Sequence, residues 1–150
     1  MFFLGDCDPY GIDILCQYAF SNRVFFIHES TLKLTQDFIF EECGNPDIRW
    51  LGLFPEELQH LSGSLEANFY DERKIQELLL RPYFNSSFSL DLGEFCSEIQ
   101  QRFEKIKLWR EKIILMQKSK KKAEIEILYK NSSNNLINYI SNKIKKNLFL

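Results

Sequence analysis

The chain of 150 residues is long enough for one domain with a packed core, and its 45% of hydrophobic residues, including 14 Phe, excludes a disordered protein. No run reaches about 18 apolar residues, so we expect no membrane span. The net charge of −2 hides an asymmetry: residues 1–100 carry 6 Lys and Arg against 17 Asp and Glu (−11), whereas residues 101–150 carry 13 against 4 (+9). The basic half is therefore either a surface for nucleic acid or another subunit, or a helical region with solvated lysine-rich faces.

The cysteines are scattered along the chain and form no Cys-x-x-Cys pair. This spacing argues against a zinc site and suits a reducing compartment, the nucleus or the cytosol. The first residues lack the basic stretch and the small-residue cleavage site of a signal peptide. The four cysteines are Cys7, Cys16, Cys43 and Cys96.

The first eighteen residues predict a strand, a loop and a helix. Met1–Leu4 is a short apolar run that indicates a buried strand of a parallel sheet. Gly5 marks the end of this strand. Asp8 is well placed as the N-cap of a helix, with Pro9 at the first helical position, where the missing N–H is tolerated. One face of the helix packs on the sheet through Ile12, Leu15, Cys16 and Ala19.

Asp6 and Asp8 follow this predicted strand and are candidate metal ligands. Open α/β sheets place their ligands at the carboxyl ends of the strands. Two carboxylates two residues apart suit a hard cation such as Mg²⁺, which binds one or two carboxylates and keeps several waters. The alternative is purely structural, because Asp8 is already explained as a helix cap.

Strands and turns follow in the next segment. Val24–Ile27 is strand-like, residues 31–42 form a loop or a weak hairpin, and Gly44–Asp47 is a turn. Ile48–Phe54 then predicts a second buried strand, in which Trp50 between leucines is a core residue. A short helix is expected to start at Pro55 and to include Leu58.

The rest of the chain predicts helices. One spans Asp71–Leu80, buries Leu78 and Leu79, and ends before Pro82. A loop follows at 85–89. Residues 94–130 predict one or two long helices, interrupted at Lys118–Lys122 and resumed at 123–128. After a break at 131–135, Leu136–Ile140 and Ile144 predict a last short amphipathic helix. The stripe of the long helix comprises Phe95, Ile99, Phe103, Ile106, Trp109 or Arg110, Ile113 and Met116.

Four ordered blocks of the chain resemble one known family. Gly5–Leu15 is similar to the Asp-x-Asp-Pro-x-Gly-x-x-Ile segment of the TOPRIM domain in the A-type subunit of DNA topoisomerase VI. The meiotic recombination proteins that make programmed DNA double-strand breaks share this segment. Ile48–Leu58 resembles the strand and helix that come next in the family. The Arg-Pro-Tyr block at 81–83 and Ser119–Ile125 resemble its later helices.

The resemblance implies an α/β fold, a partial TOPRIM (Rossmann-like) parallel sheet with flanking helices and a helical C-terminal extension. Residues 1–93 would form the partial TOPRIM domain, without its first strand or strands, and residues 94–150 the C-terminal helical region of the same domain. In the family, Mg²⁺ is held by the two Asp-x-Asp carboxylates, here Asp6 and Asp8, and by a glutamate on an earlier strand. The nucleophilic tyrosine belongs to an upstream winged-helix domain. We therefore expect no catalytic residue in this chain.

The function implied is that of a metal-binding C-terminal fragment of a topoisomerase VI A-like meiotic recombination protein. Such proteins break DNA by transesterification, and the related topoisomerase is an ATP-dependent type II enzyme. We expect the chain alone to be inactive. Its partners would be double-stranded DNA, contacted weakly by Lys120, Lys121 and Lys122, and a second copy or a B-type subunit. It would act in the nucleus, on chromosomes. The alternative is a non-catalytic DNA- or protein-interaction module derived from that fold.

Overall fold

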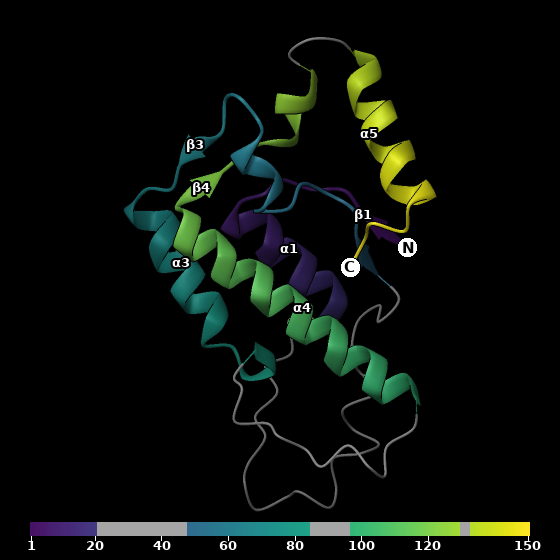
Figure 1. Cartoon of the computed structure of the whole chain (residues 1–150). Coiled ribbons are helices and arrows are strands. Elements are labelled where there is room, and N and C mark those ends of the chain that lie inside the picture. The colour runs from purple at the N-terminus through teal and green to yellow at the C-terminus, as the bar shows by residue number, and fades with distance from the viewer. Residues whose placement is uncertain (21–47, 85–96, 130–132) are drawn as a thin grey trace, which may run out of the picture.

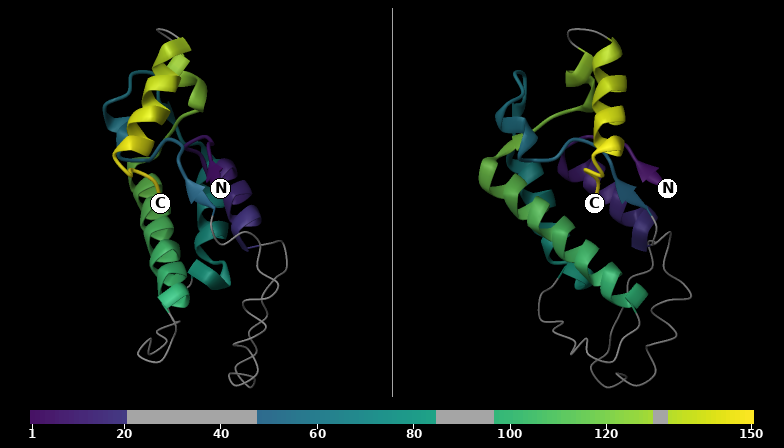
Figure 2. Two further views of the ribbon diagram at one scale, coloured as in Figure 1. Left: turned by 90° about the vertical axis from the view of Figure 1, so that its right-hand side faces the viewer. Right: turned by 45° about the vertical axis from the view of Figure 1, so that its right-hand side comes forward.

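The computed structural model describes residues 1–20, 48–84, 97–129 and 133–150. In these ranges, helices α1, α3 and α4 form a helical group, in which α3 contacts both α1 and α4 (Figures 1 and 2). Helix α5 lies apart from this helical group, and both termini lie beside strand β1 (Figure 1). The helices are α1 (Pro9–Phe20), α3 (Phe69–Leu79), α4 (Ser97–Ser119) and α5 (Ser133–Lys145), and the strands are β1 (Phe2–Phe3), β2 (Arg49–Trp50), β3 (Leu65–Glu66) and β4 (Lys121–Lys122). Single 3-10 turns occupy Glu57–Gln59, Pro82–Phe84 and Ile125–Tyr129.

Strands β1 and β2 pair in parallel, as expected, with Phe2 opposite Arg49 and Phe3 opposite Trp50. The expectation of a buried first strand was wrong, because Met1, Phe2 and Leu4 are largely exposed. Among the described strands, β1 pairs only with β2. On the other side of β2, the backbone N–H and C=O of Trp50 both bond to Leu150.

Helix α1 forms as the sequence predicts. The Asp8 carboxylate accepts a hydrogen bond of 2.5 Å from the N–H of Gly11, the capping contact expected at this position. The predicted apolar face is confirmed, since Ile12, Leu15, Cys16 and Ala19 are all buried. Its residues belong to the same core cluster as Trp50 of β2, and helix α1 also contacts α3.

The segment after β2 carries much of the core. Ile48, Trp50, Leu51, Leu53 and Phe54 are buried, which confirms that this stretch is interior. Regular pairing covers only Arg49–Trp50, so the predicted strand is shorter than the apolar run. The helix expected at Pro55 is a single 3-10 turn whose Leu58 is fully buried.

Helix α3 starts at a complete capping box. The Asn68 side chain accepts from the N–H groups of Tyr70 and Asp71, and the Asp71 carboxylate accepts from the Asn68 N–H. Leu78 is buried as predicted, but Leu79 is only half-buried, because the helix presents Asp71, Ile75 and Leu78 to the interior at helical spacing. The helix ends before Pro82, as expected.

The long helix α4 runs through Ser119 and buries Trp109, Ile113 and Met116 of the predicted stripe. Phe95 lies outside the described residues, as do the side chains of Ile99 and Phe103. The helix does not resume at 123–128: Lys120 takes a positive φ of 52°, and Lys121–Lys122 pair antiparallel with Leu65–Glu66. This tertiary pairing replaces the expected continuation, and a 3-10 turn follows.

Helix α5 begins at Ser133, inside the break expected at 131–135. Its inner face carries Leu136 and Tyr139, both half-buried, together with the buried Lys143. The predicted helix is confirmed, and Ile144, which is 41% exposed, lies off this inner face. The inner face therefore includes a charged residue that no apolar pattern reveals.

The features expected between Val24 and Asp47 and the loop at 85–89 lie outside the described residues. Strand β4 of the C-terminal part pairs with β3 of the N-terminal part, so the two expected regions share one fold. The boundary between them stays a prediction. None of the helices that the structure describes is both long and apolar enough to cross a membrane.

Candidate functional site: the acidic loop

Gly5–Asp8, here called the acidic loop, joins β1 to α1 and carries both predicted metal ligands. The Asp6 Oδ1 atom accepts a hydrogen bond of 2.7 Å from the backbone N–H of Ile125. The Asp8 Oδ1 atom accepts from Gly11, as described above. One oxygen of each carboxylate therefore receives a backbone N–H, which fixes both side chains relative to the main chain.

Cys7 anchors the middle of the loop. Its N–H and C=O both bond to the backbone of Ala123, at 2.9 and 3.0 Å. The Cys7 side chain is fully buried, whereas Asp6 and Asp8 are only half-buried, the alternation expected of extended backbone. Burial raises the pKa of the Cys7 thiol, and the negative charge of Glu57 raises it further. Cys7 is therefore a packed thiol and not a reactive one.

The two carboxylates act on each other. Burial raises the pKa of Asp8, the hydrogen bond from Gly11 lowers it, and the charge of Asp6 raises it again, with a net rise. The net rise means that burial and the nearby Asp6 charge disfavour the ionised form of Asp8 more than its hydrogen bond and Lys122 favour it.

Asp71 and Lys122 form an ion pair near the acidic loop, which the sequence did not indicate. Asp71 is 1% exposed, and its Oδ2 atom accepts from the Asn68 N–H at 2.8 Å and from Lys122 Nζ at 2.7 Å. Both charges also act on Asp8, in opposite directions. The Asn-x-x-Asp pattern could have revealed the capping box, but only the pairing of β3 with β4 brings Lys122 to Asp71.

Asp6 and Asp8 carry carboxylate oxygens, the kind of donor that hard divalent cations prefer. Among the described residues, no group of three or more His, Cys, Asp or Glu side chains could hold a metal ion. Asp6 and Asp8 supply carboxylate oxygens, and their mutual repulsion would be relieved by Mg²⁺, which needs only one or two carboxylates. The nearby Asp71 is committed to Lys122 and its capping box.

The three candidate DNA-contacting lysines have different surroundings. Lys120 is exposed and forms an ion pair of 2.8 Å with Glu72. Lys121 and Lys122 are half-buried neighbours in β4, so their side chains point to opposite faces. Lys122 is held by Asp71. Of the three, Lys120 is the side chain that solvent reaches most freely.

The Arg-Pro-Tyr block at 81–83 has a structural role. Arg81 and Lys74 both pair with Asp13 of α1, the lysine at 2.9 Å. Arg81 also donates a hydrogen bond of 2.9 Å to the Tyr83 hydroxyl. Burial would raise the pKa of Asp13, but the hydrogen bonds from Lys74 and Arg81 lower it below its ordinary value. These contacts fasten α1, which begins at the acidic loop, to α3.

Comparison with known proteins identifies the family to which this sequence is similar. The sequence model of the Toprim domain that is shared by the A-type subunit of topoisomerase 6 and by Spo11 matches residues 1–144. Toprim domains generally bind divalent metal.

Individual relatives give the same result. The chain is 31% identical to the meiotic recombination protein SPO11 of Homo sapiens and 29% identical to that of Mus musculus; each match covers 97% of this chain and 30% of the relative. It is 30% identical to the meiotic recombination protein SPO11-1 of Arabidopsis thaliana, over 95% of this chain and 33% of that protein. The chain thus spans about a third of the length of these relatives. No solved structure matches it. The chain therefore belongs to the family of Spo11 and the A-type topoisomerase 6 subunits, and its fold is that of the family's Toprim domain.

Proposed function

We propose that this chain is the Toprim part of a Spo11-like meiotic recombination protein and that its acidic loop binds Mg²⁺ for DNA double-strand cleavage by transesterification. The observation that carries the proposal is the acidic loop itself. Asp6 and Asp8 leave the carboxyl end of a parallel strand, and backbone contacts to residues 123–125 fix them in place. The relatives, which are meiotic recombination proteins, support the biological setting.

Asp6 and Asp8 would hold the cation through the carboxylate oxygens that receive no backbone N–H. When bound, such an ion offsets the negative charge that develops on a phosphate during cleavage. The Lys122–Asp71 pair limits the excess of negative charge beside the loop. A third carboxylate would come, by the resemblance, from a glutamate on an earlier strand of the family fold.

The tyrosines of this chain are poor candidates for the nucleophile. Burial raises the pKa of Tyr83 and of Tyr139, so neither hydroxyl is activated by its surroundings. The other tyrosines are exposed surface side chains, and among the described residues no contact activates their hydroxyls. They are Tyr10 and Tyr18 of α1, Tyr70 and Tyr129. We therefore propose that the chain alone cleaves no DNA and that the attacking tyrosine comes from the winged-helix part of the family.

The remaining parts of the proposal follow from the family. Double-stranded DNA would be the substrate, with Lys120, Lys121 and Lys122 as weak backbone contacts. A second copy or a B-type subunit would complete the assembly, on chromosomes in the nucleus. Lys120 suits this role best, because it is exposed and its pairing with Glu72 is a surface ion pair of small energy.

Metal binding is tested by titrating the chain with Mn²⁺ and following water-proton relaxation. Asp6→Asn should abolish binding, because the amide keeps an oxygen for the Ile125 N–H but removes the charge that holds the cation. Asp8→Asn should weaken binding strongly for the same reason. Glu126→Gln, a change of an exposed carboxylate in the 3-10 turn after β4, is the control. Equal Mn²⁺ affinity in the wild type and Asp6→Asn would refute the metal site.

The second candidate function is a non-catalytic DNA- or protein-interaction module. The observation that favours it is the hydrogen bond from Gly11 to Asp8, because capping the helix explains this carboxylate without a metal. Covalent capture separates the two functions: duplex DNA is incubated with Mn²⁺ and the chain, alone or with the upstream part of a family member. Protein linked to 5′ ends only in the mixture supports the cleavage proposal. Adducts formed by the chain alone would contradict the assignment of the tyrosine, and their absence from both supports the module.

A further inference from the structure

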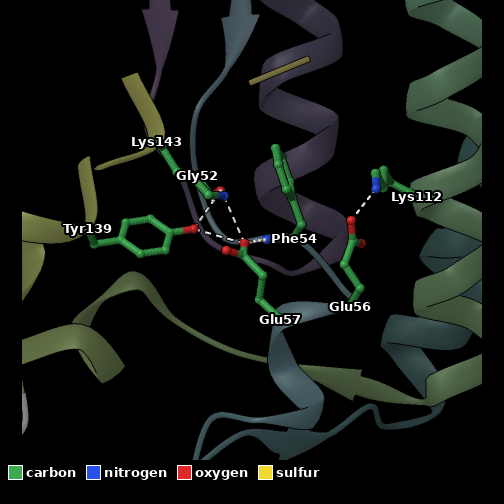
Figure 3. Close-up of polar contacts among 7 residues, drawn as sticks. All are labelled: Gly52, Phe54, Glu56, Glu57, Lys112, Tyr139 and Lys143. Carbon is green, nitrogen blue, oxygen red and sulfur yellow. Dashed lines mark hydrogen bonds and ion pairs between the residues drawn. The ribbon is translucent and has the colours of Figure 1, made fainter. Parts of the chain in front are cut away.

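A buried polar cluster joins α5 to the segment after β2 (Figure 3). Lys143 is 4% exposed; its Nζ atom donates to the Gly52 carbonyl at 2.7 Å and pairs with Glu57 Oε2 at 2.8 Å. Tyr139, one turn earlier on α5, places its hydroxyl 2.9 Å from the same Glu57 oxygen and 3.2 Å from the Gly52 carbonyl. The Phe54 N–H donates to that Glu57 oxygen at 2.7 Å.

The lysine charge is balanced by one carboxylate and by aromatic rings. Glu57 is the carboxylate it pairs with, and the face of the Phe54 ring lies with its centroid 3.5 Å from Nζ. A buried ion pair often stabilises a fold no more than apolar residues of the same volume would. We therefore expect the role of Lys143 to lie in its hydrogen bond to the Gly52 carbonyl, which fixes the position of that carbonyl.

Gly52 touches the acidic loop directly. A Cβ atom at Gly52 would lie 2.2 Å from the carbonyl oxygen of Gly5 and 2.9 Å from its nitrogen, so only glycine allows this approach. Gly5 is the first residue of the acidic loop. The charges of Glu57 and Lys143 also act on Cys7, in opposite directions, as expected of groups close behind the loop.

We propose that Lys143 and Tyr139 are positioning residues for the metal site: α5 holds the Gly52 carbonyl, Gly52 sets Gly5, and Gly5 sets the placement of Asp6 and Asp8. This inference rests on the proposed metal function of the loop. It assigns to the C-terminal helix a role that is separate from any contact with DNA.

The test compares three variants. Lys143→Met keeps the length of the side chain but removes its donor, and Tyr139→Phe removes only the hydroxyl. The control is Lys112→Met, because Lys112 pairs with Glu56 and lies over the same Phe54 ring without contacting Gly52 (Figure 3). Far-UV circular dichroism first establishes which variants are folded. Mn²⁺ affinity and the backbone amide resonances of Gly5 and Cys7 are then measured in each.

Lys143→Met should weaken Mn²⁺ binding about tenfold, the lower end of the range for residues that support metal ligands from outside the coordination shell. Tyr139→Phe should give a smaller loss in the same direction. Both should shift the Gly5 and Cys7 amide resonances, and Lys112→Met should change neither readout. If Lys143→Met fails to fold, Tyr139→Phe decides the question, since its ring still fills the site.

Wild-type affinity and unshifted loop amides in both α5 variants would overturn the inference, as would an equal loss in Lys112→Met. The two proposals fail separately. If the wild type binds Mn²⁺ and Asp6→Asn does not, the metal site stands whatever Lys143 does. If the wild type binds no Mn²⁺, the metal site falls, and the loop amides alone report whether α5 positions the loop.

Discussion

In the helical group of α1, α3 and α4, buried apolar side chains such as Leu15, Leu78 and Ile113 belong to one core cluster. The acidic loop is held in another way. Its anchors are backbone hydrogen bonds to Ala123 and Ile125 and a charge cluster centred on Lys143. Apolar packing tolerates small shifts of side chains, whereas hydrogen bonds have narrow limits of distance and angle. Apolar burial thus stabilises the helical group, whereas the polar contacts hold the acidic loop in place.

The largest expected effect on the free energy of unfolding comes from a buried leucine of the helical group. Leu78→Ala should lower the free energy of unfolding by about 2–5 kcal/mol, the range for truncating a buried leucine. Leu79→Ala should cost less, because that side chain is half-buried, and Leu80→Ala should cost little, since Leu80 is 77% exposed. Urea denaturation measures all three. A loss for Leu79→Ala as large as that for Leu78→Ala would show that Leu79 belongs to the core after all.

The helical group also contains a charged contact, the pairing of Asp13 with Lys74 and Arg81. Asp13→Asn should lower the free energy of unfolding by about 1–2 kcal/mol, the range for charged hydrogen bonds reduced for partial screening by solvent. The pKa of Asp13 is depressed in the folded state, so its contribution is complete above the ordinary pKa of 3.8 and is lost as the pH falls through the folded value.

The measurement is urea denaturation of wild type and Asp13→Asn across the acid range. The difference between them should be constant near neutral pH and should shrink on acidification. A difference that grows as the pH falls would contradict the depressed pKa. Because Asp13 does not contact the acidic loop, Mn²⁺ affinity of the folded variant should stay at the wild-type level.

The capping box of α3 should have a smaller effect. Asn68→Ala removes the acceptor for two backbone N–H groups and should cost about 1 kcal/mol. Asn68→Asp keeps an acceptor and is the matched variant. Thermal unfolding followed by circular dichroism compares them. If the two variants melt together below the wild type, the cap does not depend on the side-chain oxygen.

Lys120 should matter least for stability and most for salt-sensitive binding. Lys120→Ala removes a surface ion pair with Glu72 and should change the free energy of unfolding by less than about 1 kcal/mol. The proposed DNA role predicts weaker duplex binding at low salt, with the difference shrinking as salt rises. Fluorescence anisotropy at two salt concentrations measures it. Replacing Lys120, Lys121 and Lys122 together without any loss of binding would leave them as a solvated face.

The sequence predicted the pieces of this molecule whose causes are local. The cap at Asp8, the apolar face of α1 and the end of α3 before Pro82 all follow from interactions between residues a few positions apart. The same local logic singled out Asp6 and Asp8. It failed at Met1–Leu4, where burial depends on which strands lie alongside, and at 123–128, where pairing with β3 took the place of a helical turn.

Only the tertiary structure decided how the acidic loop is held. The Asp6 bond to Ile125 spans 119 positions, and the Lys143 bond to Gly52 spans 91. No periodicity in the sequence encodes such a contact, because periodicity reports which face of an element is apolar and not which distant element will cover it. A buried lysine on α5 even runs against that pattern. The sequence by itself determined the family's Asp-x-Asp loop and the helices around it. The fold, by bringing Ala123 and Ile125 against the loop, determined how those two carboxylates are held.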